Sequence, residues 1–394
     1  MEIIIRKLRA NNFGFVEIIS RMINWGCLPI VALFAEPEIF GQIVLVYSSI
    51  IIVTTLGGFG QQRAILMYAH CDHTAFFYAN ILSIIAAIII GLSTVLLFDL
   101  SPIIMLIVLL NVQINNLVSN ARSTNDFFIF SVLRVGITLS RFVLVMVFLS
   151  IKLSITVYLY AEFFSALLVI VIWFIVKPLP LNRASFKTDF NKIFSLFSFG
   201  LPLFLQSGVA QITQLGDRFI VSSNLGESVL ASYFFISIFC SSVAFIFSFN
   251  AQKYEVRIYR ATDMIEAKKN TTEFCVTSLK LTVIFYFISL SFYFFITYFG
   301  GKYEFDFLLM TSLFINSSLF VFSIAMNYYF SYLGKNKYII LLSSGTAILF
   351  IAIVYFLISK LGLYSIAIAG FTISLIYFLL YLFSVIRLKG LFDA

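Results

Sequence analysis

The chain has 394 residues, of which 61% are hydrophobic and only 11% are charged. A soluble domain carries about 25% charged residues, so this composition excludes a soluble globular protein. The formal net charge of +8 would suggest a nucleic-acid partner in a soluble protein, but no nucleic acid is expected here, because the basic residues follow a membrane-topology pattern.

Long apolar segments follow one another along the chain and predict membrane-spanning helices. About 20 apolar residues cross a bilayer as a helix, and backbone groups in hydrocarbon must be satisfied internally. The sequence therefore predicts an all-α polytopic membrane protein with about twelve transmembrane helices. We expect them near residues 12–34, 38–59, 75–97, 102–118, 127–150, 154–176, 193–223, 229–249, 274–299, 307–332, 338–359 and 362–386.

The basic residues predict how these helices are oriented. If the N-terminus is inside, eighteen of the 26 Lys and Arg residues lie in inner loops and only three lie in outer loops. This bias follows the positive-inside rule, so both termini are predicted to be cytoplasmic. The N-terminal segment is interpreted as a retained end, because it lacks the cleavage site of a signal peptide. The remaining five basic residues lie in the spans: Arg21, Arg134, Arg141, Arg218 and Lys280.

Two long inner connections are predicted, at 177–192 and 250–273. The first contains Lys-Pro-Leu-Pro, a natural hinge, and separates a predicted N-terminal six-helix lobe (1–176) from a C-terminal one (193–394). An internal repeat supports this division, since FGQIVLVYS (40–48) and LGESVLASY (225–233) share Gly, Val and Leu at a fixed offset. Parallel repeats of this kind predict two pseudo-symmetric bundles, as in many transporters.

Charged residues inside the spans are the first candidate site residues, since charges at the bilayer centre face protein or water. Glu17 and Arg21 are four residues apart and share one helix face. Arg141 and Glu162 are almost equally far from the turn between their helices, so they reach similar depth. These two pairs either lock helices together or line a cavity. Arg134 has no local partner, so we expect it to line an aqueous cavity with Arg21 and Arg141.

The segment NVQINNLVSN (111–120) places several amides on one predicted helix. Amides both donate and accept hydrogen bonds, which suits sugar hydroxyls. They also hold helices together in membranes, and this alternative stays open for each of them. The candidate substrate-binding amides are Asn111, Asn115 and Asn116.

Other chemistry finds little support in the sequence. The segment HCDH (70–73) lies in a predicted inner loop without a second Cys/His cluster, so no metal site is expected, and the four cysteines do not suggest disulfides. The sequence has no phosphate-binding loop, GxSxG elbow or zinc-protease motif. We expect neither an enzyme nor a cofactor. The driving force would come from an ion gradient or from substrate concentration.

The segment GLPLFLQSGVAQITQLGDRFIVSSNLGESVLASY (200–233) resembles the start of the second half of polysaccharide flippases in the multidrug/oligosaccharidyl-lipid/polysaccharide superfamily. The resemblance includes YLGKNKYIILLS (332–343), LGLYSIAIAGF (361–371) and GGFGQQRAIL (57–66), and so extends over most of the chain. Within the superfamily, the chain most resembles Wzx-type flippases of O-antigen or capsule repeat units. The matched positions are Pro202, Asp217, Arg218, Leu225, Gly226 and Tyr233.

This resemblance implies an undecaprenyl-pyrophosphate-linked oligosaccharide as substrate, moved from the inner to the outer leaflet. It implies a bacterial inner (cytoplasmic) membrane protein, with other membrane proteins of polysaccharide assembly as candidate partners. Arginines would bind the phosphates and amides the sugars. Asp217 and Arg218 point about 100° apart on the seventh helix. We expect one of them to contact the other lobe and the other to face the cavity, so that the pair forms an outer gate. The alternative is a mutually solvated pair near the helix end.

Three rival functions remain. A cation-coupled drug or metabolite exporter of the same superfamily would be expected to have an acidic cavity, whereas bases predominate in these spans. A membrane polysaccharide polymerase would be expected to carry a large outer loop, and the predicted outer loops are short. A membrane scaffold would have no need for unpaired arginines in its spans.

Overall fold

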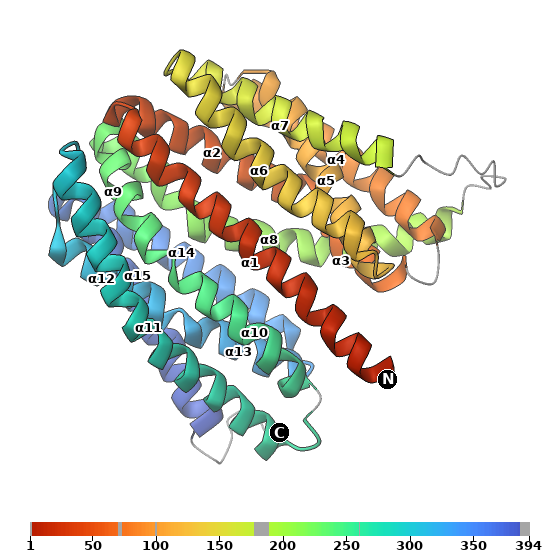
Figure 1. Cartoon of the computed structure of the whole chain (residues 1–394). Coiled ribbons are helices and arrows are strands. Elements are labelled where there is room, and N and C mark those ends of the chain that lie inside the picture. Colours follow the sequence, from red (N-terminus) through yellow and green to blue (C-terminus); the bar gives the residue numbers. More distant parts are fainter. Residues whose placement is uncertain (1, 70–72, 99–100, 177–188, 260, 387–394) are drawn as a thin grey trace. The chain divides into compact units, whose positions relative to one another are not determined.

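The computed structural model describes residues 2–69, 73–98, 101–176, 189–259 and 261–386. Within these residues the chain forms helices and no strand, which confirms the predicted all-α class (Figure 1). The helices are α1 (Glu2–Phe34), α2 (Pro37–Gly57), α3 (Gln61–Tyr68), α4 (His73–Phe98), α5 (Ile103–Ser123), α6 (Phe127–Ile151), α7 (Ile155–Val176), α8 (Phe190–Leu225), α9 (Glu227–Cys240), α10 (Val243–Tyr259), α11 (Met264–Gly300), α12 (Phe307–Leu319), α13 (Val321–Tyr332), α14 (Asn336–Leu361) and α15 (Tyr364–Tyr381), followed by the π-helical turn η1 (Leu382–Ile386).

Twelve stretches of these helices are long and apolar enough to cross a membrane. Each overlaps one of the twelve predicted segments, so the predicted number of spans is confirmed. Two spans are built from two helices each, α9 with α10 and α12 with α13. The eight-residue α3 is about 12 Å long, too short to span a membrane, and packs against α4 and α5.

The helices gather into two compact units. The first contains Met1–Val31 and Gln42–Leu215, and the second contains Ala32–Gly41 and Gly216–Ala394. Helices α1, α2 and α8 therefore each contribute residues to both units. This division falls within α8, whereas most of the predicted linker 177–192 lies outside the described residues. The six-helix lobes predicted from the internal repeat stay a prediction.

Helix α5 is the centre of the first unit, where it packs against α3, α4, α6 and α7 (Figure 1). One half of α5 packs Ile107 and Val112 against α2, α4 and α7, and the other half packs Ile114 and Leu117 against α1, α6 and α7. In a bilayer, lipid tails are as apolar as these side chains, so close packing rather than exclusion from water holds the helices together. The buried face of α5 thus fixes the positions of the helices that carry the first candidate residues.

The beginning of α8 packs closely on a tight turn between α2 and α3. Gly60 has φ +67°, a left-handed conformation that favours glycine, and a Cβ there would lie 2.7 Å from Leu203 Cβ. The buried side-chain amide of Gln61 donates to the Leu196 carbonyl of α8 at 3.1 Å. A Cβ on Gly200 would lie 2.6 Å from the Phe59 carbonyl oxygen. The two backbones therefore approach each other more closely than any side chain on Gly200 would allow.

In the second unit, the two copies of the repeated motif touch each other. A Cβ on Gly41 would clash with the Glu227 backbone at the start of α9, so the glycine of the first copy allows the contact with the second. The Phe40 ring lies 5.9 Å from that of Phe234. Lys302 donates to the carbonyls of Phe34 and Ala35 at 3.0 and 3.2 Å, which secures the end of α1 in this unit.

The expectation of a long inner loop at 250–273 is wrong. Helix α10 continues to Tyr259 and α11 begins at Met264, so most of this polar segment is helical. Asp263 caps α11 by accepting from the Glu266 N–H at 2.7 Å, while the Glu266 carboxylate accepts from the Thr262 N–H at 2.8 Å. These two bonds, which resemble a capping box shifted by one residue, start a helix in a segment of low hydrophobicity.

The contact of α8 with the α2–α3 turn predicts a specific sensitivity at Gly200. Gly200→Leu should lower the apparent melting temperature of the detergent-purified protein, because overpacking a close contact costs about 1–3 kcal/mol. Gly136→Ala in α6 is the matched control, since its Cβ would find only an ordinary contact 3.7 Å from Val169. Equal melting temperatures for Gly200→Leu and wild type would contradict the close approach.

Candidate functional site

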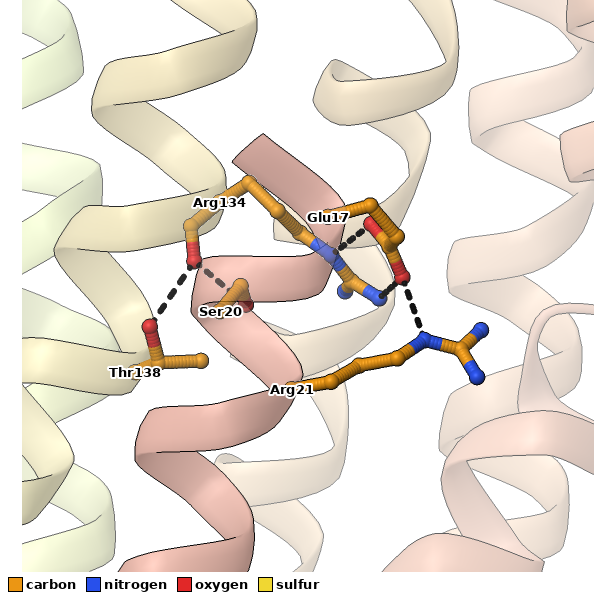
Figure 2. A network of polar contacts seen from close by, with 5 residues as sticks. All are labelled: Glu17, Ser20, Arg21, Arg134 and Thr138. Carbon is orange, nitrogen blue, oxygen red and sulfur yellow. Dashed lines mark hydrogen bonds and ion pairs between the residues drawn. The ribbon is translucent and has the colours of Figure 1, made fainter. Parts of the chain in front are cut away.

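One carboxylate in the first unit accepts hydrogen bonds from two arginines (Figure 2). Arg134 on α6 makes two bonds to Glu17 on α1, from Nε to Oε2 at 2.7 Å and from Nη2 to Oε1 at 2.6 Å. Arg21, one turn along α1, donates from Nε to Glu17 Oε1 at 3.1 Å. Paired N–H donors on a planar guanidinium match a carboxylate and make the Arg134 contact strong and directional. The group carries two positive charges and one negative charge.

Neighbouring contacts fix this group between α1 and α6. Ser20 Oγ and Thr138 Oγ1 both donate to the Arg134 carbonyl at 3.2 Å, so the backbone of Arg134 is held as well as its side chain (Figure 2). Phe13 packs its ring edge-on against Phe130, with centroids 4.9 Å apart. The side chains of Glu17, Arg134 and Arg21 are 22%, 29% and 43% exposed, so the charged group is accessible from one side.

A second ion pair lies further along α6 and is almost fully buried. Arg141 Nε lies 2.8 Å from Glu162 Oε2 of α7, and their side chains are 17% and 2% exposed. The N–H does not point along this contact, so charge attraction rather than an aligned hydrogen bond joins the two. Tyr158, one turn before Glu162, donates its hydroxyl to Glu162 Oε1 at 2.8 Å. Both oxygens of the buried carboxylate therefore have a partner.

The structure confirms two predicted contacts and adds a third. The pairs Glu17–Arg21 and Arg141–Glu162 are both present. Arg134, for which no local partner was expected, binds the distant Glu17. The seven residues between Arg134 and Arg141 correspond to about 10.5 Å along α6, so two ion pairs lie at two depths beside one helix. Whether these arginines also meet a substrate stays a prediction.

The amides of α5 have different surroundings. Asn116 is fully buried and its Nδ2 donates to Asn80 Oδ1 at 2.8 Å and to Ser83 Oγ at 2.7 Å, both on α4. Asn116 therefore joins two helices in this structure, and its predicted role in substrate binding stays untested. Asn111 is also buried, with 8% exposure, whereas Asn115 is partly exposed. For these two residues a role in substrate binding stays a prediction.

Asp217 and Arg218 lie at the α8–α9 corner of the second unit. Asp217 is only 6% exposed, accepts a hydrogen bond from the Tyr233 hydroxyl through Oδ2, and accepts the Arg218 backbone N–H through Oδ1 at 2.8 Å. The Arg218 guanidinium lies 4.5 Å from the centre of the Phe234 ring, a cation–π distance. A mutually solvated pair is therefore ruled out. The proposed gating role of these residues stays a prediction.

Sequence reasoning missed the hydroxyls that complete these sites. Tyr158 precedes Glu162 by four residues, so helical spacing alone could have identified it. Tyr233 was noted only as a matched motif position, because its contact with Asp217 depends on the angle between α8 and α9. Metal binding at HCDH (70–73) falls largely outside the described residues. Among those described, no group of three or more His, Cys, Asp and Glu residues could hold a metal ion.

Three solved structures that are similar to this chain are described as membrane transporters. The chain matches an inward-facing multidrug resistance MATE family transporter of the MOP superfamily, with TM-score 0.70, 15% identity, and coverage of 93% of this chain and 97% of the other. An outward-facing structure of such a transporter matches with TM-score 0.57, 14% identity, and coverage of 95% and 94%. The chain has the fold of these transporters.

A third similar structure is a MOP superfamily transporter from Pyrococcus furiosus, described as having a binding pocket of reverse polarity that suggests a different function. It matches with TM-score 0.59, 13% identity, and coverage of 95% of this chain and 94% of the other. No protein-family model and no curated protein sequence matches the chain. At these identities the likeness establishes the fold, and the Wzx-type subfamily is not shown.

The Arg141–Glu162 pair predicts strongly non-additive effects on stability. Arg141→Met leaves a buried carboxylate without its counter-charge and should cost about 3–5 kcal/mol, seen as lower yield of folded protein and a lower apparent melting temperature. The double variant Arg141→Met/Glu162→Met should recover most of this loss, because neither charge then remains buried alone. Arg122→Met, on the exposed end of α5, is the control and should change little. A double variant as unstable as the single one would contradict this account.

Proposed function

We propose that the protein is a membrane transporter that exports an amphiphilic compound. The observation that carries this proposal is the fold. The structural match spans 93% of this chain and 97% of a protein described as a multidrug resistance MATE family transporter. The division into two compact units supports it further, since transporters commonly expose a site to each side in turn by moving two such bundles. Here α1, α2 and α8, which contribute to both units, would bend or tilt during that movement.

The charges of the candidate site favour an anionic or neutral substrate over an organic cation. Glu17 and Glu162 are each bound to arginine, and Asp217 is bound to Tyr233 and to a backbone N–H. A cationic drug would have to displace one of these partners to reach a carboxylate. The group formed by Glu17, Arg21 and Arg134 has an excess positive charge and is partly exposed, so it would attract an acidic group. The reverse-polarity pocket described for the Pyrococcus transporter is a precedent for such variation among proteins of this fold.

A second candidate function is the flipping of a polyprenyl-pyrophosphate-linked oligosaccharide from the inner to the outer leaflet of a bacterial inner membrane. The same excess of arginine favours it, because a pyrophosphate carries several oxygens that guanidinium groups bind well. The motif resemblance around Asp217 and Arg218 also supports it. The lipid tail of such a substrate would stay in the bilayer, and Asn115 would be available for its sugars.

Transport by purified protein in liposomes tests the charge preference. Wild type should move an anionic fluorescent amphiphile, such as a carboxylated dye, and should not move ethidium, because the candidate site attracts negative charge. Arg21→Gln should reduce uptake of the anionic dye by about 10- to 100-fold, the effect of losing one charged hydrogen bond. Arg122→Gln is the matched control and should transport normally. Efficient transport of ethidium but not of the anionic dye would refute an anionic substrate.

Sidedness of the lipid-linked oligosaccharide separates the two candidates. Spheroplasts with and without the chain would be treated with a membrane-impermeant reagent that labels sugars. The flippase function requires labelling that depends on the chain and falls in Arg21→Gln at equal protein level. Labelling that is independent of the chain, together with dye transport in liposomes, would leave the exporter as the function.

A further inference from the structure

A groove on the second unit is lined by residues that take no part in the candidate transport site. It is a hollow of about 360 Å³ between α13, α14 and α15. Most of its wall comes from one face of α14, where residues recur at helical spacings of three and four. Phe330 contributes from α13, and Ile376 and Leu380 contribute from α15. The α14 residues are Tyr338, Leu341, Leu342, Gly345, Thr346 and Leu349.

The groove is lined almost entirely by carbon, and part of its wall is exposed. Leu341 is 72% exposed, and a Cβ on Gly345 would meet nothing within 4 Å, so the glycine leaves the middle of the groove empty. The Thr346 hydroxyl donates to the Leu342 carbonyl at 2.8 Å and so is already satisfied. A pocket for a polar small molecule would need several converging polar groups, which these walls do not offer. An extended hydrocarbon chain is the ligand that suits such a groove.

The length of the groove matches one leaflet of a bilayer. From Tyr338 to Leu349 the α14 face rises about 16 Å, which is half of the roughly 30 Å hydrocarbon thickness of a membrane. The groove lies within the candidate span Lys337–Leu361 and begins at its N-terminal end. Tyr338, which is 46% exposed, stands at this end, where aromatic rings commonly mark the membrane surface.

The same end of the groove is positively charged. Lys335 and Lys337 flank the start of α14, and the N-terminus of a helix adds a partial positive charge. Lys337 is exposed, and its charge is therefore accessible at this end of the groove. A juxtamembrane Lys attracts an anionic lipid headgroup by about 1 kcal/mol.

We propose that this groove binds one acyl chain of an anionic phospholipid from the surrounding bilayer, with its phosphate beside Lys335 and Lys337. The apolar stripe of α14 holds the chain, and the lysines select a negative headgroup. The site is separate from the charged pairs of the first unit, so lipid binding here does not depend on which substrate the protein transports.

Native mass spectrometry of the full-length protein in detergent, titrated with phosphatidylglycerol or phosphatidylcholine, tests this proposal. Wild type should bind one phosphatidylglycerol about tenfold more tightly than one phosphatidylcholine. Gly345→Leu should weaken the first binding step for both lipids at least tenfold, because leucine occupies the groove. Ile348→Phe adds similar bulk on the same helix, at a position that is 70% exposed and outside the groove, and should bind as wild type does.

A second variant tests the headgroup contact independently. Lys335→Gln/Lys337→Gln should lose the preference for phosphatidylglycerol while still binding phosphatidylcholine. Unchanged binding in Gly345→Leu, or an unchanged preference in the double lysine variant, would overturn the proposal. So would a wild-type dimer that dissociates in Gly345→Leu, because the groove would then hold a second copy of the chain.

Discussion

A carboxylate inside a membrane-spanning helix must find both a counter-charge and hydrogen-bond donors, and Glu17 finds them mainly on a helix far along the chain. Arg134 uses Nε and Nη2 on the two oxygens of Glu17, so the planar fork allows little rotation between α1 and α6. Losing either partner would leave a charge in a region that solvates it poorly. These bonds, together with the Ser20 bond to the Arg134 carbonyl and the packing of Phe13 on Phe130, fix the register of α1 against α6. The partly exposed side chains of this group form the candidate substrate site.

Helix α6 connects this group to the rest of the first unit. Two turns beyond Arg134, Arg141 pairs with Glu162, so the same helix is tied to α1 at one depth and to α7 at another. Asn116 adds a third polar connection, from α5 to α4. Because the bilayer provides little hydrophobic drive between helices, such polar contacts specify which helix faces which, while the apolar packing of α5 supplies most of the contact area.

The sequence predicted those features that depend on local spacing. Apolar segment length predicted the twelve spans, and helical periodicity predicted that Arg21 lies beside Glu17. The Arg141–Glu162 pair was predictable because a short turn forces adjacent helices to run antiparallel at equal depth. Glu17 and Arg134 are 117 residues apart, and no local rule shows that α1 packs on α6. Helix joining was the open alternative for Asn116, but its partners Asn80 and Ser83 could not be identified for the same reason, since they belong to another helix. The α11 cap at Asp263 is predictable from the sequence, because Asp263 and Glu266 are three residues apart. The low hydrophobicity of the segment favours a loop instead, and that prediction is wrong.

The two units differ in how their charged residues are paired and buried, and this difference bears on function. The first unit keeps paired charges among its spans, with an excess of arginine around one carboxylate that is open on one side. Among its described residues the second unit buries one carboxylate, Asp217, beneath Tyr233 and places Arg218 on an aromatic ring, while its last three spans contain no acidic residue. The proposed acidic substrate would find its complement at the arginines of the first unit. The proposed lipid would find its complement at the apolar face of α14 in the second unit. If both sites are occupied in the membrane, the polarity of each binding surface would separate two ligands of the same charge. The substrate would bind the polar, partly enclosed group, and the lipid would bind the apolar groove.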